Sequence, residues 1–154
     1  MTHHSTFTIE RRLVGSAAHG FSFWAQPEMK RRWSSCHPEW RELEYHMDFR
    51  VGGGEISRMV TPDGVEHDVI SQYQDIEVGR RIVYAYRMIV DGQAASASLA
   101  TVEFADAPGG SLMTYTEQVA LLTGAQSASA LQFGTETGFE RLVLEIERDL
   151  VLSH

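Results

Sequence analysis

The sequence predicts an α+β fold in which a curved, seven-stranded antiparallel sheet wraps around one long C-terminal helix. Hydrophobic and polar residues alternate through most of residues 43 to 118, which is typical of strands, and hydrophobic residues recur at helical spacing near the C-terminus. The order of the elements supports the same fold, because two short helices are expected after the first strand and the long helix comes last.

The first strand and the two short helices are expected within the first 34 residues. Residues Thr6 to Leu13 alternate in polarity and form the expected strand. Ser16 is placed to cap a short helix that runs through Trp24. Pro27 suits the first turn of a second helix, Glu28 to Ser34, because its missing N–H is not needed there.

Six further strands are expected, separated by turns rich in Gly, Pro and Asp, which favour tight backbone conformations. The first of them would place Tyr45, Met47, Phe49 and Val51 on one face, since side chains alternate along a strand. The expected strands are Leu43–Val51, Glu55–Val60, Glu66–Ile76, Arg81–Val90, Ser98–Phe104 and Ser111–Ala120.

The C-terminal segment carries an apolar stripe at helical spacing. Two starting points are open for this helix. Thr137 and Glu140 have the spacing of a capping box, and the alternative is a start near Ser129, with Gly134 and Gly138 inside the helix. The stripe consists of Phe139, Leu142, Val143, Ile146 and Leu150.

This order of elements predicts a cavity. One long helix can cover only part of a wide, twisted sheet, so the sheet must curl around it. The uncovered part of the concave face then becomes a cavity roofed by the two short helices, and such cavities are mostly apolar with a few placed polar groups. No internal repeat or linker is recognisable, so we expect one domain over residues 1–154.

Composition narrows the expected partners. The chain has 154 residues, of which 43% are hydrophobic and 22% charged, and its net charge is −8. An acidic chain without a long basic tract is a poor ligand for nucleic acid or anionic membranes. The single cysteine, Cys36, and the absence of a recognisable signal peptide or membrane span predict a cytoplasmic protein. A homodimer remains an open alternative.

Five segments in order resemble a known family. They resemble segments of the START/Bet v 1-like superfamily and, within it, of the family named after the activator of Hsp90 ATPase. The matching features are the opening strand, a short helix ending in tryptophan, a "D-x-R-x-G-G" hairpin and two later stretches. The segments are Phe7–Arg11, Gln26–Trp33, Asp48–Gly54, Pro62–His67 and Gly110–Gln118.

The sequence departs from that family at two places. Ala17-Ala18 stands where "A-P" is usual, and Gly138-Phe139 stands where Gly-Trp often opens the last helix. The resemblance implies the helix-grip architecture. Similar proteins include co-chaperone domains, binders of lipids and hormones, and cyclases or hydrolases, so it implies either a small apolar ligand or a chaperone as partner.

Glu117 has three expected roles, because an unpaired buried carboxylate is costly. It would be exposed at a rim, paired with an arginine such as Arg58 or Arg87, or a functional acid. Arg58 shares a face with Ile56 and Val60, so it is expected to point inward with them. Core packing explains part of the aromatic set. The candidate ligand-binding residues are Trp33, Arg58, Tyr73, Tyr84, Tyr86, Met88, Tyr115 and Glu117.

The leading functional prediction is the binding of a small, largely apolar molecule. The alternatives are a general acid–base enzyme, with Glu117 and a tyrosine or Arg58 as proton donors, and a protein-interaction module. The basic run from Lys30 to Arg32 is expected to be solvated, with contact to an acidic ligand group as the alternative. No cofactor motif is recognisable, and Cys36, His37, His46 and His67 lack metal-ligand spacing.

Overall fold

The computed structural model describes residues 2–34, 38–124 and 126–152 of the chain. The described part contains one antiparallel sheet of seven strands, whose order across the sheet is β1-β7-β6-β5-β4-β3-β2. Along the chain the elements are β1 (His3–Leu13), α1 (Ala17–Ala25), α2 (Pro27–Ser34), β2 (Arg41–Met47), β3 (Gly54–Val60), β4 (Glu66–Glu77), β5 (Arg81–Val90), β6 (Gln93–Ala107), β7 (Gly110–Leu121) and α3 (Ala128–Leu152).

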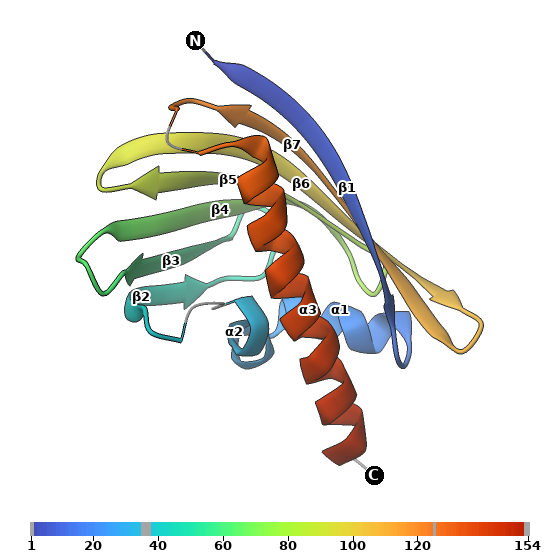
Figure 1. Cartoon of the computed structure of the whole chain (residues 1–154). Coiled ribbons are helices and arrows are strands. Elements are labelled where there is room, and N and C mark those ends of the chain that lie inside the picture. The colour runs from blue at the N-terminus through green and yellow to red at the C-terminus, as the bar shows by residue number, and fades with distance from the viewer. Residues whose placement is uncertain (1, 35–37, 125, 153–154) are drawn as a thin grey trace.

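The helices lie on the concave side of the sheet. The strands curve around α3, which crosses their inner face diagonally, and α1 and α2 lie together near one end of the sheet (Figure 1). This arrangement confirms the predicted helix-grip fold, with two short helices between the first two strands and one long helix at the C-terminus.

The starts of two helices follow local capping chemistry. The Ser16 hydroxyl accepts a hydrogen bond from the His19 amide at 3.1 Å, as predicted for the cap of α1. The Ser127 hydroxyl accepts one from the Ala130 amide at 3.1 Å, so α3 begins at the earlier of the two proposed starts. Thr137 lies inside the helix and donates to the carbonyl oxygen of Phe133 instead.

The predicted strand Leu43–Val51 is wrong at its second half. β2 ends at Met47, and the chain then turns: Asp48 N–H donates to the Gly54 carbonyl, and Val51 is 57% exposed. A Cβ at Gly53 would lie 2.4 Å from the Asp48 carbonyl oxygen, so this tight turn needs glycine. In contrast, β6 is longer than predicted at both ends.

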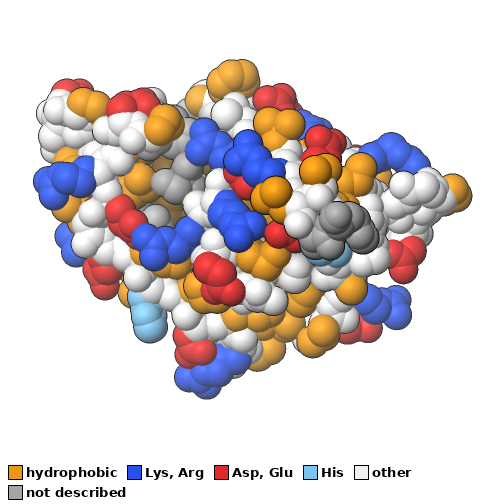
Figure 2. Space-filling view, turned by 90° about the horizontal axis from the view of Figure 1, so that it is seen from below, with side chains coloured by type: hydrophobic (Ala, Val, Ile, Leu, Met, Phe, Trp, Pro, Cys, Tyr) orange, Lys and Arg blue, Asp and Glu red, His pale blue; other side chains and the backbone are white. Residues whose placement is uncertain are grey.

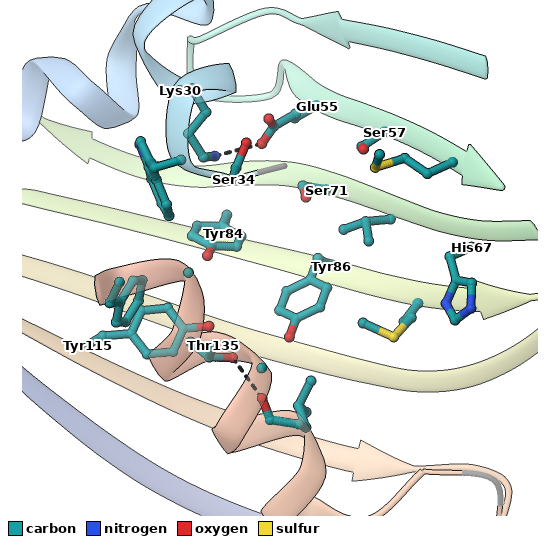
Figure 3. Close-up of a pocket in the computed structure, with 18 of the residues that line it drawn as sticks. Lys30, Ser34, Glu55, Ser57, His67, Ser71, Tyr84, Tyr86, Tyr115 and Thr135 are labelled. Atoms are coloured by element: carbon teal, nitrogen blue, oxygen red, sulfur yellow. Dashed lines mark hydrogen bonds and ion pairs between the residues drawn. The ribbon is translucent and has the colours of Figure 1, made fainter. Parts of the chain in front are cut away.

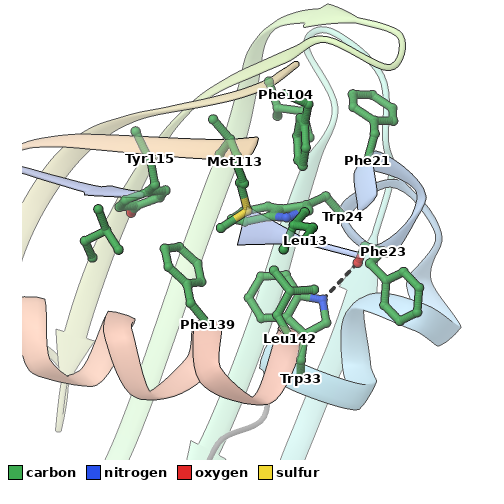
Figure 4. Close-up of a cluster of buried hydrophobic side chains, with 14 of the residues drawn as sticks. Leu13, Phe21, Phe23, Trp24, Trp33, Phe104, Met113, Tyr115, Phe139 and Leu142 are labelled. Atoms are coloured by element: carbon green, nitrogen blue, oxygen red, sulfur yellow. Dashed lines mark hydrogen bonds between the residues drawn. The ribbon is translucent and has the colours of Figure 1, made fainter. Parts of the chain in front are cut away.

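The hydrophobic core fills the space between the sheet and the helices. Leu142 and Ile146 of α3 are fully buried, as the apolar stripe predicted. Aromatic rings from α1, α2 and α3 meet in this core: Trp24 packs against Trp33 at 4.7 Å between ring centroids and against Phe139 at 5.8 Å (Figure 4). The helix is therefore held by contacts with α1 and α2 as well as with the sheet.

The face seen in Figure 2 mixes charges of both signs with scattered hydrophobic side chains. Several of the described ion pairs are exposed, including Arg31–Glu42 and Arg50–Asp48. Among the described residues, no helix has the length and apolar character that crossing a membrane requires.

Candidate functional site

A pocket of about 400 Å³ opens between α2, α3 and the concave face of β3, β4 and β5 (Figure 3). Its size falls within the range of small-molecule sites. More than half of the residues that line it are hydrophobic, most of these are aromatic, and polar side chains lie among them. The wall includes Trp24, Trp33, Trp40, Met59, Val69, Tyr84, Tyr86, Met88, Tyr115, Leu131 and Phe139.

Glu117 is fully buried behind the tyrosines of this wall. Its carboxylate accepts hydrogen bonds from the hydroxyls of Tyr86 at 2.6 Å, Ser98 at 2.6 Å and Tyr115 at 2.5 Å. Three hydroxyl donors suit an anionic acceptor, because hydrogen bonds to an ionised group are short and strong. Two of the roles expected for Glu117 are therefore wrong, because the acid is not exposed at a rim and hydroxyls rather than an arginine satisfy it. The third, a functional acid, stays a prediction.

Lys30 and Glu55 form a second buried polar group in the pocket wall. The Lys30 ammonium lies 2.8 Å from one carboxylate oxygen of Glu55, and Tyr45 donates to the other at 2.7 Å. The same ammonium lies 5.3 Å from the Trp24 ring centroid and 5.6 Å from that of Trp33, within the range of cation–π attraction. The predicted solvated basic face is therefore wrong for Lys30, whose side chain is buried.

Helical spacing could have identified Lys30 as an inward residue. It lies three positions before the buried Trp33, and residues three apart share one face of a helix. For Glu55 the corresponding signal is strand alternation with Ser57 and Met59, all of which line the pocket. Neither residue was expected to point inward, because lysine and glutamate are rarely buried unless they are paired.

Two glycines leave room for the pocket. Gly134 and Gly138 lie one turn apart on α3 and line the cavity. A Cβ added at either position would meet no atom within 4 Å. Glycine inside a helix costs about 1 kcal/mol relative to alanine, so these positions give up helix stability while the space beside them stays open.

Arg58 lies on the opposite face of the sheet. It contacts Glu66 at 2.9 Å and Glu44 at 3.2 Å, and it pairs in register with Asp68. Hydrogen bonding from Arg58 lowers the pKa of the Glu66 carboxyl below its ordinary value. The predicted proximity of Arg58 to Glu117 is therefore wrong. Strand periodicity separates the two faces of β3 but does not say which one is buried, and Ile56 lies on the outer face here.

The structure brings most of the other candidate residues together. Of the candidates predicted from sequence, five line the pocket: Trp33, Tyr84, Tyr86, Met88 and Tyr115. Tyr73 is buried nearby, with its ring centroid 6.2 Å from that of Tyr84, but it lies outside the pocket wall. Its hydroxyl has no hydrogen-bond partner among the described residues.

Two buried polar atoms of the pocket wall also lack a partner within the described ranges. They are the indole nitrogen of Trp24 and the side-chain oxygen of Gln126. The described residues contain no cluster of three or more His, Cys, Asp or Glu side chains that could hold a metal ion. Cys36 and His37 lie outside the described residues.

All five tyrosines of the chain have a raised pKa, mainly because burial disfavours the charged phenolate. The negative charges of Glu55 and Glu117 add to this effect. In the unfolded chain the tyrosine pKa is about 10. The folded state therefore retains protons that the unfolded state loses, so stability is fully present below pH about 10 and falls as the pH rises above it.

We therefore expect the native protein to show no tyrosine ionisation near pH 10. In a titration followed by the ultraviolet absorbance of tyrosinate, all five residues should ionise together with unfolding, which circular dichroism would detect in parallel. A tyrosine that ionises near pH 10 while the protein stays folded would contradict the burial described here.

Comparisons with known proteins agree with this fold. Residues 16–149 match the model of the family described as "Activator of Hsp90 ATPase homolog 1-like protein". The search of curated proteins gave no match.

Several solved structures are similar to the chain over nearly its whole length. A protein from Rhizobium leguminosarum has 43% sequence identity and a TM-score of 0.91, and the match covers 96% of this chain and 97% of that one. The Mll3558 protein from Rhizobium loti has 41% identity and a TM-score of 0.87, covering 94% and 99%.

A more distant structure shares the fold alone. The AHSA1-like protein from Aeromonas hydrophila has 19% identity and a TM-score of 0.71, and the match covers 94% of each chain. The family match over residues 16–149 spans most of the chain, which therefore belongs to the Activator of Hsp90 ATPase homolog 1-like family.

Proposed function

We propose that this protein binds a small, largely apolar molecule in the pocket between the sheet and α3. The observation that carries the proposal is the pair of pocket-facing glycines in α3, beside which about 400 Å³ stays open. A protein that needed only stability would fill such a space, because alanine at these positions improves the helix and larger side chains bury apolar surface.

The polar groups of the wall suit a ligand with a small number of polar atoms. Lys30 and Glu55 form an ion pair with no net charge at the α2 side, and the tyrosine hydroxyls lie on the sheet. Aromatic side chains fill the area between them, and their large apolar surfaces supply binding free energy. Because this ion pair carries no net charge, it favours an uncharged or dipolar group at this end of the ligand. A fully charged ligand group would pair with one of the two residues and leave the other buried without a counter-charge.

The proposal is tested by filling the pocket from α3. In the Gly138→Leu variant the new side chain would occupy the open space, and the helix would gain up to about 1 kcal/mol of intrinsic propensity. We expect the variant to fold normally and to bind the apolar fluorescent probe N-phenyl-1-naphthylamine at least about tenfold more weakly than the wild type. Fluorescence titration measures the affinity, and native mass spectrometry of freshly purified protein shows whether a co-purified molecule is lost.

The matched control is Thr137→Leu, which adds a leucine to the exposed side of the same helix. It should bind the probe as the wild type does. Unchanged probe affinity in a folded Gly138→Leu variant would show that the ligand does not occupy this pocket.

The Lys30–Glu55 pair supports one alternative, general acid–base catalysis on a bound molecule. An ammonium and a carboxylate 2.8 Å apart in a pocket wall can move protons to and from a ligand. Incubation of the extracted ligand with the protein separates this function from binding alone. A change of ligand mass with the wild type, abolished in Lys30→Met, would indicate an enzyme, and an unchanged ligand would indicate a binding protein.

A further inference from the structure

We propose that the ligand carries a hydrogen-bond donor, a hydroxyl or N–H group, which the hydroxyl oxygens of Tyr86 and Tyr115 accept. This inference rests on the ligand-binding function proposed above and names the chemical group that the site selects. It follows from the way in which Glu117 orients the protons of the tyrosines.

Each tyrosine hydroxyl has one proton to donate. Tyr86 donates its proton to one oxygen of Glu117 at 2.6 Å, and Tyr115 donates to the other oxygen at 2.5 Å. The third donor is the hydroxyl of Ser98 on β6. Ser98 lies opposite Tyr86 of β5 and Val119 of β7, so the strand register holds the three hydroxyls close to Glu117. Both tyrosine protons therefore point at the buried acid, away from the pocket.

The buried carboxylate fixes this orientation. Glu117 is fully buried, and the groups that donate hydrogen bonds to its carboxylate, from Tyr86, Ser98 and Tyr115, are all hydroxyls. Turning one tyrosine proton into the pocket would leave an anionic oxygen with fewer donors at a fully buried position, at a large cost. The tyrosines also retain these protons over the ordinary pH range, because burial and the charge of Glu117 raise the pKa of both.

Tyr86 and Tyr115 thus present oxygen lone pairs to the cavity. Tyr86 and Tyr115 both line it, and in Figure 3 their hydroxyl oxygens lie in the space between the sheet and α3. Gln126 adds an acceptor beside them. Its amide nitrogen lies 3.4 Å from the sulfur of Met88, a residue that follows Tyr86 by two positions on β5. The side-chain oxygen of Gln126 has no partner among the described residues. A ligand hydroxyl can donate to the oxygens of Tyr86 and Tyr115, whereas an ether or ketone oxygen at the same place would face these two oxygens without a proton between them.

The inference is tested with a pair of probes that differ in one proton. 2-Naphthol and 2-methoxynaphthalene share an apolar ring system, but only the first can donate a hydrogen bond. We expect isothermal titration calorimetry to give an affinity for 2-naphthol about 3- to 10-fold higher, the effect of one hydrogen bond. Competition with N-phenyl-1-naphthylamine places both probes in the same pocket.

Variants identify the groups responsible. In Tyr86→Phe the preference for 2-naphthol should fall toward one. In Glu117→Gln the amide nitrogen donates to one hydroxyl oxygen, so that a hydroxyl turns its proton into the pocket and the preference disappears or reverses. Tyr73→Phe is the matched control: it removes a buried tyrosine hydroxyl outside the pocket wall, and the preference should remain.

The outcomes separate this inference from the proposed function. If neither probe binds, the proposed function fails and the inference fails with it. If both bind equally well to the wild type, or if the preference survives in both Tyr86→Phe and Tyr115→Phe, the inference alone is overturned. Should Glu117→Gln fail to fold, the tyrosine variants still decide the question.

Discussion

Replacing Glu55 with leucine should destabilise the protein by about 3–5 kcal/mol, because the Lys30 ammonium would stay buried without its counter-charge. The hydroxyl of Tyr45 would lose its acceptor in the same variant. Chemical denaturation followed by circular dichroism measures the free energy of unfolding.

The double variant Lys30→Met/Glu55→Leu should recover most of that loss, since it removes both charges and leaves apolar side chains among Trp24 and Trp33. An exposed ion pair provides the contrast. Arg50→Met breaks the contact with Asp48 at the protein surface and should cost less than about 1 kcal/mol. A loss for Glu55→Leu as small as that for Arg50→Met would mean that Lys30 reaches water when unpaired.

Leu142→Ala should cost about 2–5 kcal/mol, because it leaves a cavity where α3 packs against the core. Leu144 provides a matched control in the same helix, since its side chain is 60% exposed. Leu144→Ala should change the free energy of unfolding by no more than about 0.5 kcal/mol. Equal denaturation midpoints for the two variants would show that α3 does not hold the sheet through this face.

The fold could be predicted because its signals are local and periodic. Alternation identified all seven strands, the apolar stripe identified the core face of α3, and Ser16 identified the start of α1. The predicted end of β2 was wrong because polarity continues to alternate from Asp48 to Val51 although the backbone turns there. Periodicity describes side chains, and it does not register a turn that the backbone makes through Gly52 and Gly53.

The site was predictable only in part, because its polar contacts join distant strands. Tyr86 and Glu117 meet across β5 and β7, and no spacing in the sequence encodes that contact. Arg58 was placed inward because it lies between two apolar residues, although the outer face of a sheet also accepts aliphatic side chains. Lys30 was missed because a charge in a basic run is normally solvated, and only its partner Glu55 makes burial favourable.

The strand order also governs how the chain can be assembled during synthesis. Of the seven strands in the sheet, β1 is synthesised first, yet it pairs with β7, so that His3 lies opposite Leu121. The backbone hydrogen bonds between β1 and β7 cannot form until β7 has been translated, and closing so long a loop slows folding. Until then the alternating segment from Thr6 to Leu13 is an unpaired β-edge, the kind of segment that molecular chaperones shield from aggregation.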